Sequence, residues 1–516
     1  MQQICSNAVE QTFAQIGNRV DRFELWGGST VTKLDPGAEF SALIGEENVL
    51  TDEAARSGYA HDRLPYANFR AREGALVGTL PGLVLRPKTT EEVAAVVRKA
   101  GELDLPLIPY GRGSGVLGGI IPLGNELMLD VRRMNRILEL DRENHLVTVE
   151  AGMHGEDFED ALNAQGFTCG HLPQSLTIST VGGWAACRGG GQESSRYGKI
   201  ENIVVGLKAI LPDGEVLDIR PLPKRASGPS ILDLIVGNEG TLAVITQLTM
   251  RIWTLPEAEE KIVLALPDRE AALNLGRKIM QAGLHPRIVR LYDEKETAGR
   301  TEGIAAFGDR PVMANIVLCG EAAIVAAEAV IVREFAASVD AVETETRPFD
   351  EWRKSRYVSI TKQWLEKGYY NDTIEVTVNW TKATSLYDTI AARIAQVAPD
   401  AHFSAHWSHV YPEGVCQYMT IRLPPMDQAK ALPLHAELWE IATGETLAHG
   451  GSIAHHHGSG LFRGPWMDGE HGAGMEVLRR IKAAIDPQNL FNPGKLGFPP
   501  RPNAIDPYRD RSTHEQ

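Results

Sequence analysis

The hydrophobic pattern divides the chain into two stretches, and in each stretch helical and strand-like periods alternate. The first stretch ends near Trp253 and combines apolar side chains at helical spacing with short apolar runs. Its expected helices are residues 91–103 and 156–164, and its expected strands are residues 105–109, 127–131, 145–152, 204–211 and 215–219. The last two strands flank Pro212-Asp213-Gly214, a turn sequence. The first stretch is therefore predicted to be an α+β unit.

The second stretch begins at Lys261 and predicts a separate α/β domain. Its expected strands are residues 262–266, 287–293, 312–319, 373–380 and 415–423, and its expected helices are residues 269–283, 322–339 and 382–397. This order favours an antiparallel sheet with helices packed on it. A further helix is expected from Met475 to Ile485, before Asp486-Pro487.

Composition restricts the class of protein. The 516 residues are 43% hydrophobic and 23% charged, which are ordinary globular values. The formal net charge of −15 argues against nucleic acid or an anionic membrane as partner. Five scattered cysteines without a C-x-x-C pair fit a reducing compartment, and no apolar run reaches the roughly 18 residues that span a bilayer. We therefore expect a cytoplasmic protein with no transmembrane segment and no secretory signal.

Three glycine-rich loops, each next to strand-like sequence, carry the first candidate chemistry. Residues 109–119, PYGRGSGVLGG, follow an apolar run, and their amides together with Arg112 would cradle a phosphate. A plain glycine-rich loop is the alternative for this segment alone. Residues 172–198 add hydroxyl donors and more glycines, and residues 235–245 place Glu239 at a turn before a strand. Three such loops are too much for a small anion and suit an extended dinucleotide.

The residues expected to hold the dinucleotide come from all three loops. They are Pro109, Tyr110, Gly111, Arg112, Gly113, Ser114, Gly115, Val116, Pro173, Gln174, Ser175, Thr177, Thr180, Gly182, Gly183, Ser194, Tyr197, Gly198, Glu239, Gly240 and Ile245.

These loops resemble those of the FAD-binding flavoproteins of the vanillyl-alcohol oxidase and p-cresol methylhydroxylase (PCMH) type. The matching segments, in order, are PYGRGSG at 109–115, PQS and STVGGW within 173–184, NIVVGLKAILPDG at 202–214 and VGNEGTLAVIT at 236–246. The resemblance continues to the tail DPQNLFNPGKL and implies FAD as the cofactor.

One branch of this family is more similar than the others. SIAHHHGSG at 452–460 looks most like the alkylglycerone-phosphate synthase branch, and Trp26-Gly27-Gly28 is similar to that branch as well. Val116 follows the RGSG turn, so no histidine stands there to link covalently to flavin as in some relatives. We therefore predict non-covalent FAD.

The resemblance also implies how the chain is organised. The implied fold class is α+β, with a two-subdomain PCMH-type FAD-binding domain and an α/β cap domain that contains an antiparallel sheet. The expected boundaries are 1–85 for an N-terminal extension, 86–255 for the FAD-binding domain, 256–470 for the cap or substrate domain, and 471–516 for a C-terminal helix and a tail that returns to the FAD domain.

Three adjacent histidines and one tyrosine are the catalytic candidates. His455, His456 and His457 would face the flavin in the family, and imidazoles titrate near neutrality, so they can move protons. A metal site and an idle polar turn are the alternatives. Adjacent histidines on an extended segment point to alternate sides, so we predict no metal. Tyr418 lies in a segment similar to the synthase stretch whose tyrosine serves as acid or base, although aromatic strand residues are mostly core.

Two further side chains are candidates for binding a substrate. Arg356 would hold a carboxylate or phosphate with both arms of its guanidinium, or lie on a solvated helix face beside Arg353 and Lys354. His406 would project into the same cavity together with His409, although a core position explains both equally well.

The sequence leaves three functions open. The first is an FAD-dependent dehydrogenase or oxidase, in which hydride leaves a hydroxyl-bearing carbon of a small hydroxy acid or alcohol while His456, His457 or Tyr418 takes the hydroxyl proton. The second is alkyl transfer as in alkylglycerone-phosphate synthase, without net redox change. The third is a flavin-binding protein without turnover. His456 stands where the D-lactate dehydrogenase branch has Glu, whereas FNPGKLG reads like that branch. We favour the first, with an unidentified electron acceptor and a homodimer left open.

Overall fold

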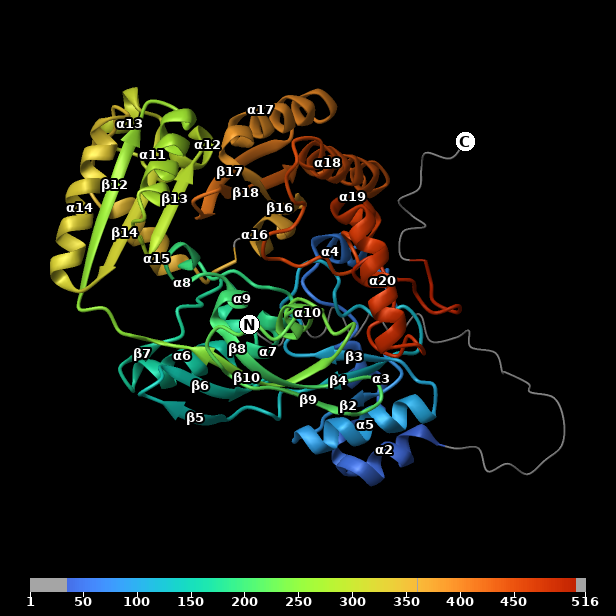
Figure 1. Cartoon of the computed structure of the whole chain (residues 1–516). Helices are drawn as coiled ribbons and strands as arrows, with labels where there is room; N and C mark the ends of the chain where they lie inside the picture. Colours follow the sequence, from blue (N-terminus) through green and yellow to red (C-terminus); the bar gives the residue numbers. More distant parts are fainter. Residues whose placement is uncertain (1–34, 360, 507–516) are drawn as a thin grey trace, which may run out of the picture.

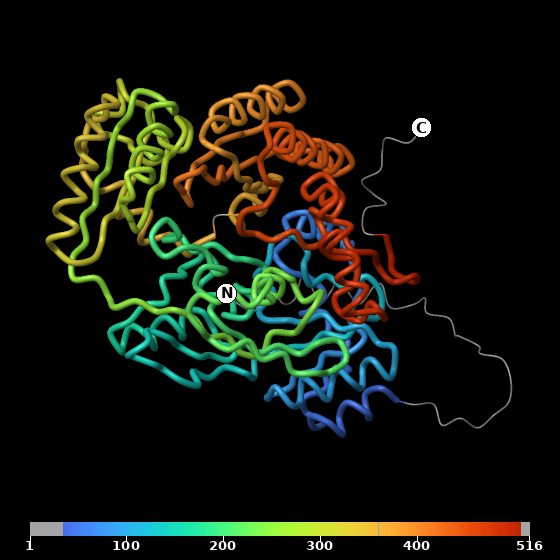
Figure 2. The backbone as a smooth tube through the Cα atoms, in the orientation of Figure 1, coloured from blue at the N-terminus to red at the C-terminus, as the bar shows by residue number. Residues whose placement is uncertain are grey.

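The computed structural model describes residues 35–359 and 361–506, which form two parts (Figures 1 and 2). The first part, residues 35–254, carries the blue and green elements in the lower half of the view. The cap, residues 258–466, carries the yellow and orange elements in the upper half. The red helix α20 (Ala473–Ile485) runs from the cap down to the first part. Trp26-Gly27-Gly28, expected to resemble the synthase branch, lies outside the described residues.

Two main sheets share one apolar core in the first part. The four-stranded sheet has the order β1-β2-β4-β3, with β1 (Val49–Leu50), β2 (Val84–Leu85), β4 (Leu127–Asp130) and β3 (Leu107–Tyr110). The five-stranded antiparallel sheet has the order β5-β6-β10-β8-β9, with β5 (Ile137–Asp141), β6 (Leu146–Glu150), β10 (Val244–Arg251), β8 (Val204–Ile210) and β9 (Val216–Ile219). A small pair joins β7 (Phe167–Thr168) to β11 (Trp253–Thr254).

Helices and turns of this part follow from local sequence signals. Thr89 accepts the Glu92 amide at 3.1 Å and so caps α5 (Thr90–Glu102). Gly214 has φ 82°, which lets the turn between β8 and β9 close tightly. The remaining helices of the first part are α2 (Pro36–Ile44), α3 (Glu53–Ser57), α4 (Pro65–Ala71), α6 (Gly155–Asn163), α7 (Val181–Ala186), α8 (Ser194–Tyr197), α9 (Ile200–Ile203) and α10 (Ile231–Ile235).

The cap is built on a seven-stranded antiparallel sheet. Its order is β15-β12-β14-β13-β17-β18-β16, with β15 (Val342–Glu343), β12 (Ala258–Leu266), β14 (Val312–Gly320), β13 (Ile288–Tyr292), β17 (His402–Val410), β18 (Gly414–Leu423) and β16 (Tyr370–Asn379). Its long helices are α11 (Arg269–Gln281), α14 (Ala322–Ala337), α17 (Trp380–Val397) and α18 (Gln428–Ala448). Shorter ones are α12 (Glu294–Ala298), α13 (Ala306–Asp309), α15 (Arg347–Ser355) and α16 (Thr361–Glu366), and α19 (Met467–His471) follows the cap.

The two faces of the cap sheet differ in chemistry. Figure 1 shows the long helices on the outer side of the sheet, where the apolar core lies. On three neighbouring strands, His406, Tyr418 and Glu375 occupy paired register positions, so their side chains share one face. The expected α+β class, with an antiparallel cap sheet, is confirmed.

Both ends of the described chain cross between the two parts. Tyr66 and Phe69 of α4 enter the core of the cap, although they precede the first part's glycine loops. Leu490 and Phe491, after α20, enter the core of the first part, and the Leu107 amide donates to the Leu490 carbonyl at 2.8 Å. The expected domain boundaries stay predictions.

Two features of the cap were not expected from the sequence. Helix α18 has 21 residues with Pro433 inside, and ten of its side chains are buried, so it lacks the one-sided apolar stripe of a surface helix. Strand β17 carries histidines and serines where a buried strand would normally be apolar. Within the described ranges, no helix is both long and apolar enough to cross a membrane.

Candidate active site

The three histidines follow a short stretch that pairs with the free edge of β16. Ser452 and Thr377 exchange both backbone hydrogen bonds at 2.9 Å, so the chain enters the site as an extra strand. It then bends sharply, and His455, His456 and His457 form the histidine turn. The sheet edge therefore fixes where the turn begins.

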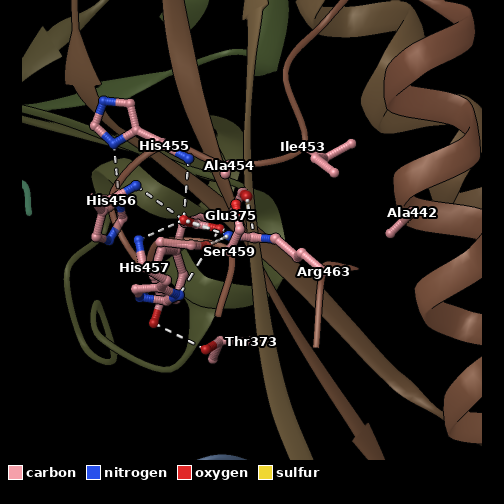
Figure 3. A network of polar contacts seen from close by, with 12 residues as sticks. Thr373, Glu375, Ala442, Ile453, Ala454, His455, His456, His457, Ser459 and Arg463 are labelled. Atoms are coloured by element: carbon pink, nitrogen blue, oxygen red, sulfur yellow. Dashed lines mark hydrogen bonds and ion pairs between the residues drawn. The ribbon is translucent and has the colours of Figure 1, made fainter. Parts of the chain in front are cut away.

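One carboxylate holds the whole histidine turn. Glu375 Oε1 accepts the amides of His455, His456 and His457 at 3.1, 3.0 and 2.8 Å (Figure 3). Arg463 donates to both oxygens of the Glu375 carboxylate, and it also donates to the Glu375 and Gly458 carbonyls at 2.8 and 2.7 Å. Both side chains are 0% exposed. Burial alone would raise the pKa of Glu375, but Arg463 and His457 lower it to about 2.

A second carboxylate, from the first part, holds the next residues. Glu239 accepts the amides of Ser459 and Gly460 at 2.6 and 2.8 Å. Gly458 lies between the two sets and has φ 78°, a conformation that favours glycine. Burial raises the pKa of Glu239 to about 7, against the backbone hydrogen bonds that lower it. The histidines are thus fixed both to the cap and to the first part.

The ring of Tyr418 lies between two histidines. It stacks on His406 at 4.8 Å and on His456 at 5.9 Å between centroids, while His457 meets it edge-on at 5.5 Å. Its hydroxyl donates to Thr373 Oγ1 at 3.1 Å. Burial raises the pKa of Tyr418 to about 12, so the phenol is protonated at neutral pH.

A second group of rings surrounds His409. The His409 Nδ1 and Ser194 Oγ lie 2.6 Å apart, and His455 Nε2 lies 2.9 Å from the Tyr411 hydroxyl. His455 and His456 approach each other through their Nδ1 atoms at 2.9 Å. His409 has φ 60° at an irregularity of β17, an uncommon conformation for a residue with a Cβ, and one that clusters at functional sites.

His455 and His456 do not point to alternate sides as expected of an extended segment, because the chain bends at these residues. Ring nitrogens of His409, His455 and His456 lie within 4.8 Å of one another. No carboxylate or thiol belongs to this group. The absence of a metal therefore stays a prediction that no longer rests on strand geometry.

The histidines of the site are neutral at neutral pH. Burial lowers the pKa of His455 and His456 well below 6.5, and neighbouring histidines and Lys199 add to this effect. Burial also lowers the pKa of His457, but the Glu375 carboxylate opposes that shift. The His457 Nδ1 lies 3.9 Å from Glu375 Oε2 and is buried without a hydrogen-bond partner. Among these rings, His457 is the one whose protonated form has a carboxylate beside it.

The two predicted substrate residues lie in different surroundings. His406 Nδ1 is 3.1 Å from Glu296, and its Nε2 is 2.8 Å from Arg290 Nη2. Burial lowers the pKa of His406 to about 4. Arg356 lies 3.5 Å from the buried carboxylate of Glu193. The structure therefore brings His406 to Tyr418 and gives Arg356 a partner within the protein.

The glycine-rich loops of the first part pack so closely that a side chain would not fit at their contact points. A Cβ on Gly111 would lie 2.3 Å from Thr180 Oγ1, and one on Gly240 would lie 2.8 Å from Pro109. Thr180 also caps α7 by accepting the Gly183 amide. The loop that carries Pro109 and Gly111 therefore packs directly against Thr180 and Gly240, a close approach that requires glycine. Glycine-rich backbone of this kind fits the phosphates of FAD, and contact with them stays a prediction.

Some expected cofactor residues are engaged with the cap. Ser194 bonds to His409, Tyr197 lies 3.8 Å through its hydroxyl from Cys319 Sγ, and Glu239 holds the stretch after the histidines. Ile245 is buried in β10. Contact of these residues with FAD stays a prediction.

Sequence reasoning missed Glu375, the residue that positions the histidine turn. A signal was present: Glu375 stands in TIEVTVNW, a strand-like run where a buried charge requires a partner. It missed Arg290 as well, because only the register of β13 with β17 brings it to His406. It also missed Glu296, because only the packing of α12 against β17 brings that carboxylate to the histidine.

Comparison with known proteins finds relatives that cover both parts of the chain. Residues 81–220 match the family model for an FAD binding domain, and residues 255–496 match that for the C-terminal domain of FAD linked oxidases. The uncharacterised FAD-linked oxidoreductase YgcU of Escherichia coli O157:H7 is 32% identical over 89% of this chain and 97% of that protein. The alkyldihydroxyacetonephosphate synthase of Dictyostelium discoideum is 29% identical over 89% and 80%.

A third relative, the D-lactate dehydrogenase of Archaeoglobus fulgidus, is 27% identical over 80% of this chain and 91% of that protein. Among solved structures, an alkyldihydroxyacetonephosphate synthase superposes with a TM-score of 0.76 at 25% identity, over 93% and 87% of the two chains. The chain belongs to the FAD-binding, PCMH-type family of FAD-linked oxidases, with FAD as its cofactor.

Proposed function

We propose that this protein oxidises a hydroxyl-bearing carbon of a small hydroxy acid or alcohol. The observation that carries this proposal is His457, a neutral imidazole placed between the Tyr418 ring and the Glu375 carboxylate. Bound FAD supplies the acceptor for the two electrons and the hydrogen that leave the substrate carbon. The protein's own residues must then take the hydroxyl proton.

His457 is the proposed base. Its Nδ1 faces Glu375 at 3.9 Å, so a proton on Nδ1 leaves the lone pair on Nε2 for the substrate hydroxyl. Once protonated, the ring gains the attraction of the Glu375 carboxylate, which the pairing with Arg463 keeps ionised. This is the arrangement of a general base whose charged form is stabilised by a buried acid.

Tyr418 is the proposed hydrogen-bond donor to the substrate oxygen. Its phenol keeps its proton at neutral pH because burial raises its pKa to about 12. The stacking with His406 and His456 fixes the plane of the ring, and Thr373 accepts the hydroxyl proton at rest. A substrate oxygen would replace Thr373 as the acceptor.

Alkyl transfer is the second candidate function. It is favoured by the synthase relative and by His456, which stands where the dehydrogenase branch has a carboxylate. Alkyl transfer has no net redox change, so only oxidation leaves the flavin reduced in the absence of oxygen.

Anaerobic titration separates the two candidates. The purified, FAD-loaded enzyme is mixed with a panel of hydroxy acids, sugar acids and alcohols, and the visible flavin absorbance is followed. Bleaching by one class of substrate supports oxidation, and His457→Gln should retain flavin but bleach far more slowly. If no substrate bleaches the flavin and the enzyme forms an ether lipid from acyl-dihydroxyacetone phosphate and a fatty alcohol, the oxidation proposal is wrong and alkyl transfer is the function.

A further inference from the structure

Arg290 of β13 carries a positive charge next to the candidate active site. Its Nη2 lies 2.8 Å from His406 Nε2, and His406 stacks on Tyr418 at 4.8 Å. Tyr418 in turn meets His457 at 5.5 Å. Two ring contacts therefore connect this guanidinium to the proposed base.

Arg290 forms no ion pair with a carboxylate within the part of the chain that the structure describes. The nearby carboxylate of Glu296 is engaged elsewhere, at 3.1 Å from His406 and 3.7 Å from Arg300. The Arg290 Nε is buried and has no hydrogen-bond partner. A partly buried guanidinium with unused donors is costly unless an anion completes it.

Other arginines near this end of the sheet are already neutralised. Arg287 lies 2.8 Å from Glu193, and Arg356 lies 3.5 Å from the same carboxylate. Both of these guanidinium groups therefore form ion pairs inside the protein. Among the described residues Arg290 forms none, and its charge acts on Glu296 only at longer range, where it helps to lower the pKa of that carboxyl to about 2.

The orientation of Arg290 is fixed before any ligand binds. Its guanidinium lies 5.3 Å from the ring centres of both Tyr292 and Trp352, which restricts its plane. Another edge of the guanidinium contacts His406. The Nδ1 of His406 donates its proton to Glu296, so the His406 Nε2 is free to accept a hydrogen bond from Arg290. A planar, pre-oriented fork with free N–H groups is the form in which arginine binds carboxylate or phosphate.

We propose that Arg290 binds the anionic group of the substrate, a carboxylate or a phosphate, and so places the neighbouring carbon at the histidine turn. This inference rests on the proposed function in one respect, namely that the substrate lies at Tyr418 and His457. It narrows the substrate class from hydroxy acids or alcohols to anionic molecules.

Equilibrium anion binding tests the assignment without turnover. Sodium oxalate and inorganic phosphate are titrated separately into the FAD-loaded enzyme, and the flavin absorbance change gives each dissociation constant. We expect saturable binding of at least one anion, weakened roughly ten- to hundredfold in Arg290→Gln, because a charge-assisted pair is lost. Oxalate binding identifies a carboxylate substrate, and phosphate binding identifies a phosphate ester.

Matched variants keep the test specific. Arg356→Gln measures the other candidate anchor, and Arg310→Gln removes a surface arginine that pairs with Asp340. Both should bind the anion as the unmodified enzyme does. Arg290→Lys keeps the charge but loses the fork, so it should bind with intermediate affinity, and it replaces Arg290→Gln if that variant loses flavin.

Three results would overturn the proposal: no saturable binding of either anion, unchanged binding in both Arg290 variants, or loss of binding in Arg356→Gln alone. The failure of the oxidation proposal is a separate result. If no hydroxy acid bleaches the flavin but anion binding still depends on Arg290, the anion site stands and the redox assignment falls.

Discussion

Glu375 and Arg463 form an ion pair in which neither side chain is exposed, and the same Glu375 carboxylate accepts the amides of the three histidines. The pair therefore has two functions: it neutralises a buried charge, and it fixes the backbone of the candidate catalytic residues. These two functions can be separated by substitution.

Replacing Glu375 by Gln should destabilise the protein by about 3–5 kcal/mol, because Arg463 is then left as an uncompensated buried charge. The glutamine oxygen still accepts the three amides, so the turn should keep its course. Thermal unfolding of the FAD-loaded protein measures the loss. Arg393→Gln removes a half-exposed partner of Glu445 and should cost at most about 1 kcal/mol. Equal melting temperatures for the two variants would contradict the buried-pair argument.

The pH dependence of flavin reduction should follow His457. The base is active when neutral, and its pKa lies below the ordinary 6.5, so the rate should be constant at neutral pH and fall on the acid side. In Glu375→Gln the ring loses the carboxylate that raises its pKa, so the acid limb should move to lower pH. Rapid-mixing measurements of flavin reduction across pH give the acid limb of the unmodified enzyme and that of Glu375→Gln. An acid limb that stays in place would exclude His457 as the titrating group.

Replacing Tyr418 by Phe should slow flavin reduction by roughly a hundredfold, the usual loss when one preorganised donor to the reacting oxygen is removed. The stacking with His406 and His456 survives this change, so flavin content should not fall. Thr373→Val is the matched control, because it removes only the resting acceptor of the phenol. It should reduce the rate far less than Tyr418→Phe, and a similar loss in both would indicate a packing effect.

Glu239 should make the protein less stable as pH rises. Its pKa is raised from 4.5 to about 7 in the folded state. The stabilisation from its protonated form is thus fully present below about pH 4.5 and is lost as pH rises through about 7. Glu239→Gln cannot ionise, so the difference in melting temperature between this variant and the unmodified protein should grow over that interval. A constant difference would show that Glu239 does not titrate there.

Gly111→Ala should lower the flavin content of the purified protein. The new Cβ would lie 2.3 Å from Thr180 Oγ1 and would push two of the converging loops apart. Gly124→Ala is a suitable control, since its nearest atom is 3.7 Å away, on the Glu126 side chain. Flavin content is measured from absorbance after gel filtration, and equal retention in both variants would argue against close contact of the loops.

The sequence predicts most of the fold because its periodic signals are local. The strands around Leu107, Val204 and Ile262 and the helix at Thr90 all form where apolar spacing indicates them. Helix α18 is not predicted because it is buried on several sides, so its sequence lacks the alternation of apolar and polar faces that marks a surface helix.

The site is predicted only in part because register and long-range contacts build it. His455, His456, His457 and Tyr418 could be chosen from motif resemblance, and the structure brings them together. Their controlling charges could not be chosen in this way. Glu375 becomes relevant only when β16 pairs with β18, and Arg290 only when β13 pairs with β17.

Glu239 of the first part and Glu375 of the cap accept hydrogen bonds from amides of the same short stretch, residues 455–460. Any hinge motion that separates the cap from the first part must therefore break the hydrogen bonds of one carboxylate to these amides and displace the imidazoles. An opened molecule would admit or release ligand but would be unable to accept a proton. Proton abstraction would then be confined to molecules in which both carboxylates hold their amides.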